Sequence, residues 1–192
     1  MRVLIAEDET IIRLDVRALL EKAGHQVVAE ARDGVEAVAL AAEHEPDLIV
    51  MDVRMPQLDG IAAAREITAA RAVPIVMLTA HAEGDLVARA SEAGAFGYLV
   101  KPFREVDLLP AIDTARARFD ELAALRGEAA DLAEALASRK AVERAKGILM
   151  RQEGIDEAEA FRRIRSASQK TGRQMRVVAE ALIATYAPAG EA

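Results

Sequence analysis

The 192-residue sequence contains no cysteine and no tryptophan, and only 3% of its residues are aromatic. Without cysteine the chain has neither a disulfide framework nor a thiolate metal site, which is compatible with a reducing compartment. No apolar stretch approaches the roughly 20 residues that span a bilayer, and Met1 leads directly into a predicted strand, without room for a signal peptide. We therefore expect a cytoplasmic protein without a membrane segment.

The sequence also lacks the motifs of several enzyme classes. It has no glycine-rich phosphate loop of the Walker or dinucleotide type, and its serines and histidines form no recognisable hydrolase pattern. His25, His44 and His81 are scattered, and none has metal-ligand spacing. We therefore expect a protein that is not an enzyme. The scarcity of aromatic rings leaves little for stacking on nucleic-acid bases.

The charge is divided unevenly along the chain. Residues 1–137 hold 14 Lys and Arg against 25 Asp and Glu, a net charge of −11, whereas residues 138–192 hold 11 against 7, a net charge of +4. A basic segment joined to an acidic body favours binding to nucleic acid, although a solvated helical face has the same composition.

Short apolar runs alternate with helical patterns over about the first 103 residues. The predicted strands are Val3–Ala6, Val27–Glu30, Leu48–Asp52, Ile75–Thr79 and Tyr98–Val100. The predicted helices lie near Ile11–Ala23, Val35–Glu43, Ile61–Ala70 and Asp85–Ala93. This alternation predicts right-handed crossovers and an α/β fold, a doubly wound five-stranded parallel sheet.

Charged and hydroxyl side chains stand at the ends of these apolar runs. Asp52 closes the third run, and Glu7 with Asp8 follows the first. Thr79 and Lys101 come at the ends of the last two runs. The carboxyl ends of parallel strands form one ligand crevice, so these side chains are expected to converge. Three carboxylates and a cation suit a Mg²⁺ ion held against a phosphoryl group on Asp52, because the metal and lysine offset the charge repulsion.

A fifth helix is predicted from about Arg104, with Pro110 tolerated near its start. Along this helix, from Leu108 onward, apolar residues recur at intervals of seven, a pattern weakened by alanine, arginine and Gly127. The two series are Leu108, Ala115, Leu122, Ala129, Leu136 and Ala111, Arg118, Leu125, Leu132, Arg139. The pattern fits a coiled coil between two chains, or packing within one chain.

The segment after this helix is predicted to form three short amphipathic helices. Ser138 is a candidate cap for the first, which Gly154 ends; Asp156 and Glu159 have capping-box spacing for the second, which Gly172 ends. The third runs from about Gln174 to Tyr186. The apolar faces expected to form one core are Val142, Ala145, Ile148 and Leu149; Phe161, Ile164 and Ser168; and Met175, Val178, Ala179 and Leu182.

The strand ends resemble the receiver domain of response regulators over residues 1 to about 120. The matching segments are Ala6–Glu9, Ile49–Pro56, Asp59–Gly60, Leu78–Ala80 and Gly97–Phe103. The resemblance implies a flavodoxin-like fold, a histidine kinase as partner, a receiver that assists its own phosphorylation and dephosphorylation, and a cis bond between Lys101 and Pro102. The implied roles are Asp52 as phosphoacceptor, Asp8 as direct Mg²⁺ ligand, Glu7 as assisting acid, the Arg54 carbonyl as further ligand, Thr79 as switch hydroxyl, Tyr98 as switch aromatic and Lys101 as phosphate partner.

The C-terminal segment resembles the ANTAR output domain, named for the AmiR and NasR antitermination regulators. The matching segments are Val142–Met150, Ala158–Arg165 and Val178–Ile183. Receiver, coiled coil and ANTAR domain in this order resemble the phosphorylation-dependent antitermination regulators of actinobacteria. The resemblance implies binding to paired stem-loops in nascent RNA, which prevents transcription termination and so affects RNA polymerase indirectly. We also expect dimerisation on phosphorylation.

The expected domains are a receiver at 1–120, a linking helix at 104–137 that overlaps the last receiver helix, an ANTAR domain at 138–186 and a tail at 187–192. The candidate RNA-binding residues are Arg139, Lys140, Arg144, Lys146, Gly147, Arg151, Arg162, Arg163 and Lys170. A DNA-binding helix-turn-helix factor is an alternative, although the basic charge is spread over two helices. A helical module that docks another protein is a third possibility.

Overall fold

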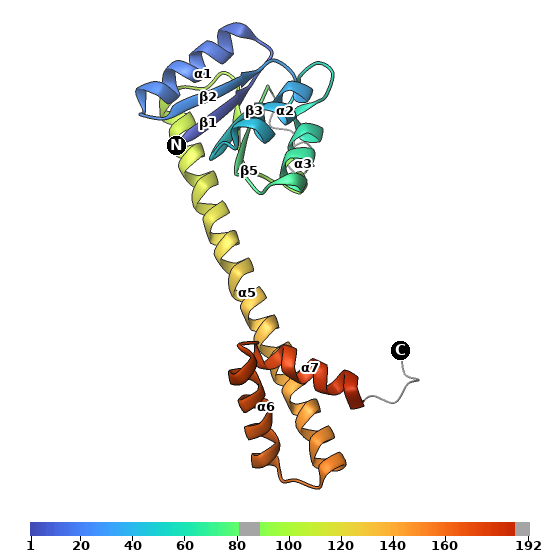
Figure 1. The fold of residues 1–192 in the computed structure, drawn as a ribbon. Coiled ribbons are helices and arrows are strands. Elements are labelled where there is room, and N and C mark those ends of the chain that lie inside the picture. The colour runs from blue at the N-terminus through green and yellow to red at the C-terminus, as the bar shows by residue number, and fades with distance from the viewer. Residues whose placement is uncertain (81–88, 187–192) are drawn as a thin grey trace. The chain divides into compact units, whose positions relative to one another are not determined.

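The computed structural model describes residues 1–80 and 89–186, and its ribbon is drawn in Figure 1. The chain divides into two compact units, Met1–Ala123 and Ala124–Ala192. Within the described residues, no helix is both long and apolar enough to cross a membrane.

The first unit is built on a five-stranded parallel sheet. The strands are β1 (Arg2–Ala6), β2 (Gln26–Ala31), β3 (Leu48–Asp52), β4 (Ile75–Thr79) and β5 (Ala95–Val100). Their spatial order is β2-β1-β3-β4-β5, so the chain reverses direction across the sheet next to β1. This is the flavodoxin-like order, in which the ligand crevice lies at the carboxyl ends of β1 and β3. The predicted fold class is confirmed.

Helices cover both faces of this sheet because its central strands are apolar on both sides (Figure 1). On one face, Ile49 and Met51 of β3 pack in a core with α2 (Gly34–His44) and α3 (Gly60–Ala70). On the other, Leu48 and Val50 belong to the core of α1 (Thr10–Lys22) and the first turns of α5 (Glu105–Glu153). Of the predicted helix Asp85–Ala93, residues 85–88 lie outside the described residues, and 89–92 are helical.

Helix α5 is one continuous element of 49 residues, with Pro110 inside its second turn. The predicted helix start at Ser138 is therefore wrong. A capping residue needs a non-helical backbone, but Ser138 lies among strong helix formers, alanine, leucine, arginine and lysine, with no proline or glycine to interrupt the hydrogen-bond ladder. The first of the three predicted C-terminal helices is the end of α5.

In the second unit, the end of α5 packs with α6 (Glu157–Thr171) and α7 (Met175–Tyr186). The α6 N-cap is Asp156, whose side chain accepts a hydrogen bond from the Glu159 amide at 2.7 Å, as the capping-box spacing predicts. The expected core position of Phe161 is wrong, since this residue is 38% exposed. The buried face of α6 is centred on Ala160 and Ile164, which leaves Phe161 at its edge.

Candidate functional site

Three carboxylates meet at the crevice. Glu7 and Asp8 follow β1, Asp52 ends β3, and one carboxylate oxygen from each lies within 4.8 Å of the other two. Parallel pairing of β1 with β3 produces this meeting, because it aligns Ala6 with Met51 and so brings the residues that follow them to the same edge. Three carboxylates that each offer one oxygen at this spacing match the oxygen ligands that Mg²⁺ prefers.

Lys101 closes one side of this acidic group. Its Nζ lies 2.7 Å from Glu7 Oε2 and 2.9 Å from Asp52 Oδ2. The backbone holds it there: the Lys101 amide donates to the Thr79 carbonyl at 2.7 Å, and the bond to Pro102 is cis, as the resemblance implied. Burial alone lowers the pKa of the Lys101 ammonium, but its interactions with the Glu7 and Asp52 carboxylates outweigh burial and raise the pKa. The lysine is therefore a fixed positive charge beside Asp52.

The carboxylate of Glu7 is only partly satisfied. Its Oε2 is buried and, among the described residues, has no partner with full hydrogen-bond geometry, although Lys101 lies at ion-pair distance. Burial raises the pKa of the Glu7 carboxyl group, and the neighbouring Lys101 opposes this rise. A buried carboxylate oxygen with spare acceptor capacity fits a site that takes up a second cation.

Asp8, Asp52 and Lys101 line a cavity of about 220 Å³, together with Arg54 and Ala80, whereas Glu7 is buried and does not line it. The loop that carries Arg54 is folded tightly onto β3, with the Gly60 amide donating to the Val53 carbonyl at 2.9 Å. A Cβ atom at Gly60 would lie 1.9 Å from the Asp52 carbonyl oxygen, so only glycine permits this approach. The cavity has room for a metal ion and a phosphoryl group next to Asp52.

Of the site residues predicted for the receiver, Tyr98 alone lies apart from the others. Thr79 is buried at the end of β4, directly beside the Lys101 backbone. Tyr98 is 50% exposed on β5 and does not line the cavity. A role for Tyr98 as a switch therefore requires its side chain to move.

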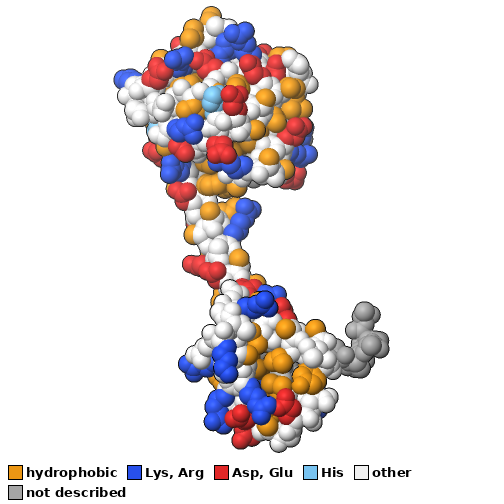
Figure 2. Space-filling model, in the orientation of Figure 1, with side chains coloured by type: hydrophobic (Ala, Val, Ile, Leu, Met, Phe, Trp, Pro, Cys, Tyr) orange, Lys and Arg blue, Asp and Glu red, His pale blue; other side chains and the backbone are white. Residues whose placement is uncertain are grey.

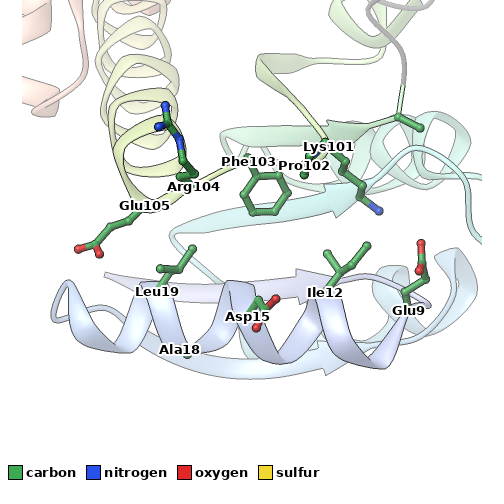
Figure 3. A pocket seen from close by; sticks show the side chains of 11 residues that line it. Glu9, Ile12, Asp15, Ala18, Leu19, Lys101, Pro102, Phe103, Arg104 and Glu105 are labelled. Carbon is green, nitrogen blue, oxygen red and sulfur yellow. The ribbon is translucent and has the colours of Figure 1, made fainter.

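A larger groove of about 590 Å³ opens beside the cavity, between α1 and the segment Lys101–Glu105 (Figure 3). Ile12 and Leu19 of α1 form one wall, and Phe103 stands opposite them (Figure 3). Next to it, Ile11 and Leu14 are exposed on α1. The groove was not predicted from the sequence. A signal for it was present, because α1 has more apolar residues than one buried face needs.

The basic residues of the second unit have different environments. Figure 2 shows several Lys and Arg side chains on one face of this unit, with hydrophobic side chains beside them. Gly147 is half-buried on α5, and within 4 Å a Cβ atom there would meet, among the described residues, only the Arg151 guanidinium, at 3.6 Å. The candidates exposed at the surface are Arg139, Lys140, Arg144, Arg151, Arg162, Arg163 and Lys170. Of these, Arg162 and Arg163 form ion pairs with neighbouring glutamates.

Lys146 is not the exposed cation that the sequence predicted. Its side chain is 9% exposed, and its Nζ contacts both carboxylate oxygens of Glu143, at 2.9 and 3.0 Å, and Glu157 Oε1 at 2.6 Å. The hydrogen bonds to Glu157 and Glu143 raise its pKa. Helical periodicity places Lys146 next to the buried face but gives no information about Glu157, which approaches from α6. Lys146 therefore links α5 to α6 through its ion pair with Glu157.

Comparison with known proteins agrees with this geometry. The model of the response regulator receiver domain matches residues 3–113, and that of the ANTAR domain matches residues 130–183. The chain therefore belongs to the response regulators that combine a receiver domain with an ANTAR domain. It is 53% identical over 184 residues to the transcriptional regulatory protein PdtaR of Mycobacterium tuberculosis, covering 96% of this chain and 90% of that protein.

Two solved structures resemble the first unit. The two-component response regulator of the LuxR family from Aurantimonas sp. SI85-9A1 is 38% identical with a TM-score of 0.58, covering 60% of this chain and 84% of that one. The CheY of a CheX–CheY–BeF3–Mg²⁺ complex from Borrelia burgdorferi is 26% identical with a TM-score of 0.57, covering 58% and 86%.

Proposed function

We propose that a histidine kinase phosphorylates Asp52, and that this controls RNA binding by the C-terminal unit. The observation that carries the first half is the meeting of Glu7, Asp8 and Asp52 with Lys101, at a cavity that Asp8, Asp52 and Lys101 line. In this proposal Mg²⁺ is held by the carboxylates of Glu7, Asp8 and Asp52 and by the Arg54 carbonyl. The Mg²⁺ named in the Borrelia complex supports the choice of metal.

The chemistry at Asp52 depends on charge. A carboxylate is repelled by an incoming phosphoryl group, and bound Mg²⁺ supplies positive charge that offsets this repulsion. The Lys101 ammonium, 2.9 Å from Asp52 Oδ2, offsets the remainder and can pair with the phosphoryl oxygens. The Thr79 hydroxyl donates a hydrogen bond to a phosphoryl oxygen on Asp52, and the Tyr98 side chain moves inward from its exposed position. Both are switch elements of the proposal.

The groove beside the cavity supports the proposal that a partner docks on the α1 side of Asp52. Ile12 and Leu19 on one side of the groove and Phe103 on the other form an apolar slot next to Lys101. This slot suits a helix of the partner whose reactive side chain must reach Asp52. Exposed Ile11 and Leu14 extend the apolar surface. We assign this face to the kinase.

The second unit is proposed to bind paired RNA stem-loops and thereby prevent transcription termination. The ANTAR match and the exposed basic residues of α5 and α6 support this assignment. Lysine and arginine supply phosphate contacts, and the bare backbone at Gly147 permits close approach of a ligand between Arg144 and Arg151. We place the receiver at 1–120, the linking helix at 104–137 and the output at 138–186.

The phosphorylation half is tested with a small phosphodonor and Mg²⁺, followed by mass-spectrometric mapping of the label. We expect one phosphoryl group on Asp52 and none in Asp52→Asn. Chelation of Mg²⁺ abolishes labelling of the wild type if the charge argument holds. A variant at an aspartate outside the cavity, Asp113→Asn, is the control and retains full labelling. Undiminished labelling of Asp52→Asn contradicts the assignment.

A further inference from the structure

The guanidinium group of Arg13 is buried near the start of α1, although arginine usually lies at the surface. Its Nη1 donates to the Glu7 carbonyl oxygen at 2.7 Å and lies 3.5 Å from the Asp8 carbonyl oxygen. Its Nε donates to Glu30 Oε2 at 3.3 Å, and its Nη2 donates to Thr10 Oγ1 at 3.4 Å. One side chain thus connects the two acidic positions after β1 to β2 and to α1.

These bonds complete the attachment of the segment Glu7–Glu9, which follows β1, to β2 and α1. On one side, the Glu7 amide donates to the Ala31 carbonyl at 3.0 Å, which anchors the segment to β2. On the other, the Arg13 amide donates to the Glu9 carbonyl at 3.0 Å, while the Arg13 side chain holds the two preceding carbonyls. The planar fork of an arginine can serve several acceptors at once, which a lysine ammonium cannot do in the same geometry.

We infer that Arg13 is a positioning residue for the Mg²⁺ site, an inference that rests on the metal-dependent phosphorylation proposed above. Arg13 bonds the backbone carbonyls of Glu7 and Asp8, so their carboxylates stay available to the metal while the backbone from which they project is fixed. Asp8 depends on this support most, because its side chain is exposed and packing does not hold it. Mg²⁺ tolerates little departure from octahedral geometry, so a residue that orients the ligands strengthens metal binding without contacting the metal.

Arg17 provides a matched control. It lies one turn further along α1 and binds the other oxygen of the same carboxylate, Glu30 Oε1, at 2.6 Å, and it also pairs with Glu21. Its side chain is 45% exposed, and its described hydrogen bonds go to these two glutamates alone. Arg17→Ala therefore removes a partner of Glu30 but leaves the bonds from Arg13 to the carbonyls in place.

The test measures metal binding directly, with Mn²⁺ as the probe and electron paramagnetic resonance of the free ion as the readout, on the full-length unphosphorylated chain. Arg13→Ala is expected to weaken Mn²⁺ binding about tenfold or more, as removal of ligand-orienting partners does in other metal sites. Arg13→Lys is expected to fall between this variant and the wild type. Arg17→Ala binds Mn²⁺ like the wild type, and Asp8→Ala loses the site.

A second readout separates positioning from loss of folded protein. In Arg13→Ala and Arg13→Lys, the Mg²⁺ concentration that half-saturates phosphorylation by a small phosphodonor rises, while the maximal rate at saturating Mg²⁺ stays near that of the wild type. Loss of folded protein lowers the maximal rate and leaves the half-saturating concentration unchanged. Unchanged Mn²⁺ affinity in both Arg13 variants, with the site lost in Asp8→Ala, overturns the role of Arg13 alone. Absence of Mn²⁺ binding in the wild type overturns the metal site as well.

Discussion

Two lysines in this chain each sit between two carboxylates, yet their surroundings give them different roles. Lys101 pairs with Glu7 and Asp52 at the edge of a cavity that has room for a ligand. Lys146 pairs with Glu143 and Glu157 where α5 meets α6, and its side chain is 9% exposed. The same ion-pair chemistry thus lies at a cavity in one unit and between packed helices in the other.

Lys146→Ala is expected to destabilise the second unit, because it leaves Glu143 and Glu157 facing each other without the cation between them. Lys140→Ala, at an exposed position on the same helix, changes the free energy of unfolding by less than about 0.5 kcal/mol. Thermal unfolding of the two variants, followed by circular dichroism, makes the comparison. An unchanged melting temperature for Lys146→Ala contradicts the structural role, as does a loss of RNA affinity with the fold intact.

At the residue scale, the sequence predicted side chains whose position follows from strand ends. Asp52, Glu7, Asp8 and Lys101 meet because parallel strands end at one edge. It did not predict the burial of Arg13 and Lys146, each of which pairs with a residue of another element, or the exposure of Phe161. Arg13 is buried by carbonyls of the preceding loop and by Glu30, and helical periodicity contains no information about either.

At the scale of elements, α5 is the helix in which sequence and structure differ most. Its start was predicted within one residue, but its length was not, because a serine that can cap a helix does so only where the backbone leaves helical geometry. Beyond Ala123 the helix keeps three leucines at the surface: Leu125, Leu132 and Leu136. All three belong to the seven-residue series, which supports pairing of this face with a second chain.

The double substitution Leu132→Glu and Leu136→Glu is expected to prevent dimerisation of the phosphorylated protein. It places like charges opposite each other where the seven-residue series of two chains would pair. Leu132 is 72% exposed, so folding of the single chain is little affected. Ala130→Glu, which is also exposed but outside both series, is the control and dimerises like the wild type. Light scattering over a wide concentration range, with and without phosphodonor, gives the masses. Equal dimerisation of the double variant and the control contradicts the proposed seam.

At the scale of the whole molecule, the charge division seen in the sequence matches the proposed division of function. The acidic unit holds the proposed phosphorylation site, and the basic unit holds the exposed lysines and arginines proposed to contact RNA, with α5 contributing residues to both units. The fold of the first unit could be predicted because its β-α alternation is local and strongly patterned. The RNA sequence that the proposed RNA-binding unit would recognise could not be predicted, because base recognition depends on contacts that helical periodicity does not encode.

The central claim is that phosphorylation of Asp52 controls RNA binding by residues 138–186. Its most direct test measures affinities for a two-hairpin RNA, a one-hairpin RNA and a duplex DNA of equal charge, with and without phosphodonor, for the wild type and Asp52→Asn.

The account predicts that only the phosphorylated wild type binds the two-hairpin RNA tightly. A dimer makes the second contact intramolecular, so one hairpin binds far more weakly, and affinity falls steeply with salt as phosphate contacts are lost. Equal affinity for all three nucleic acids, or an affinity for the two-hairpin RNA that phosphodonor does not change, contradicts it.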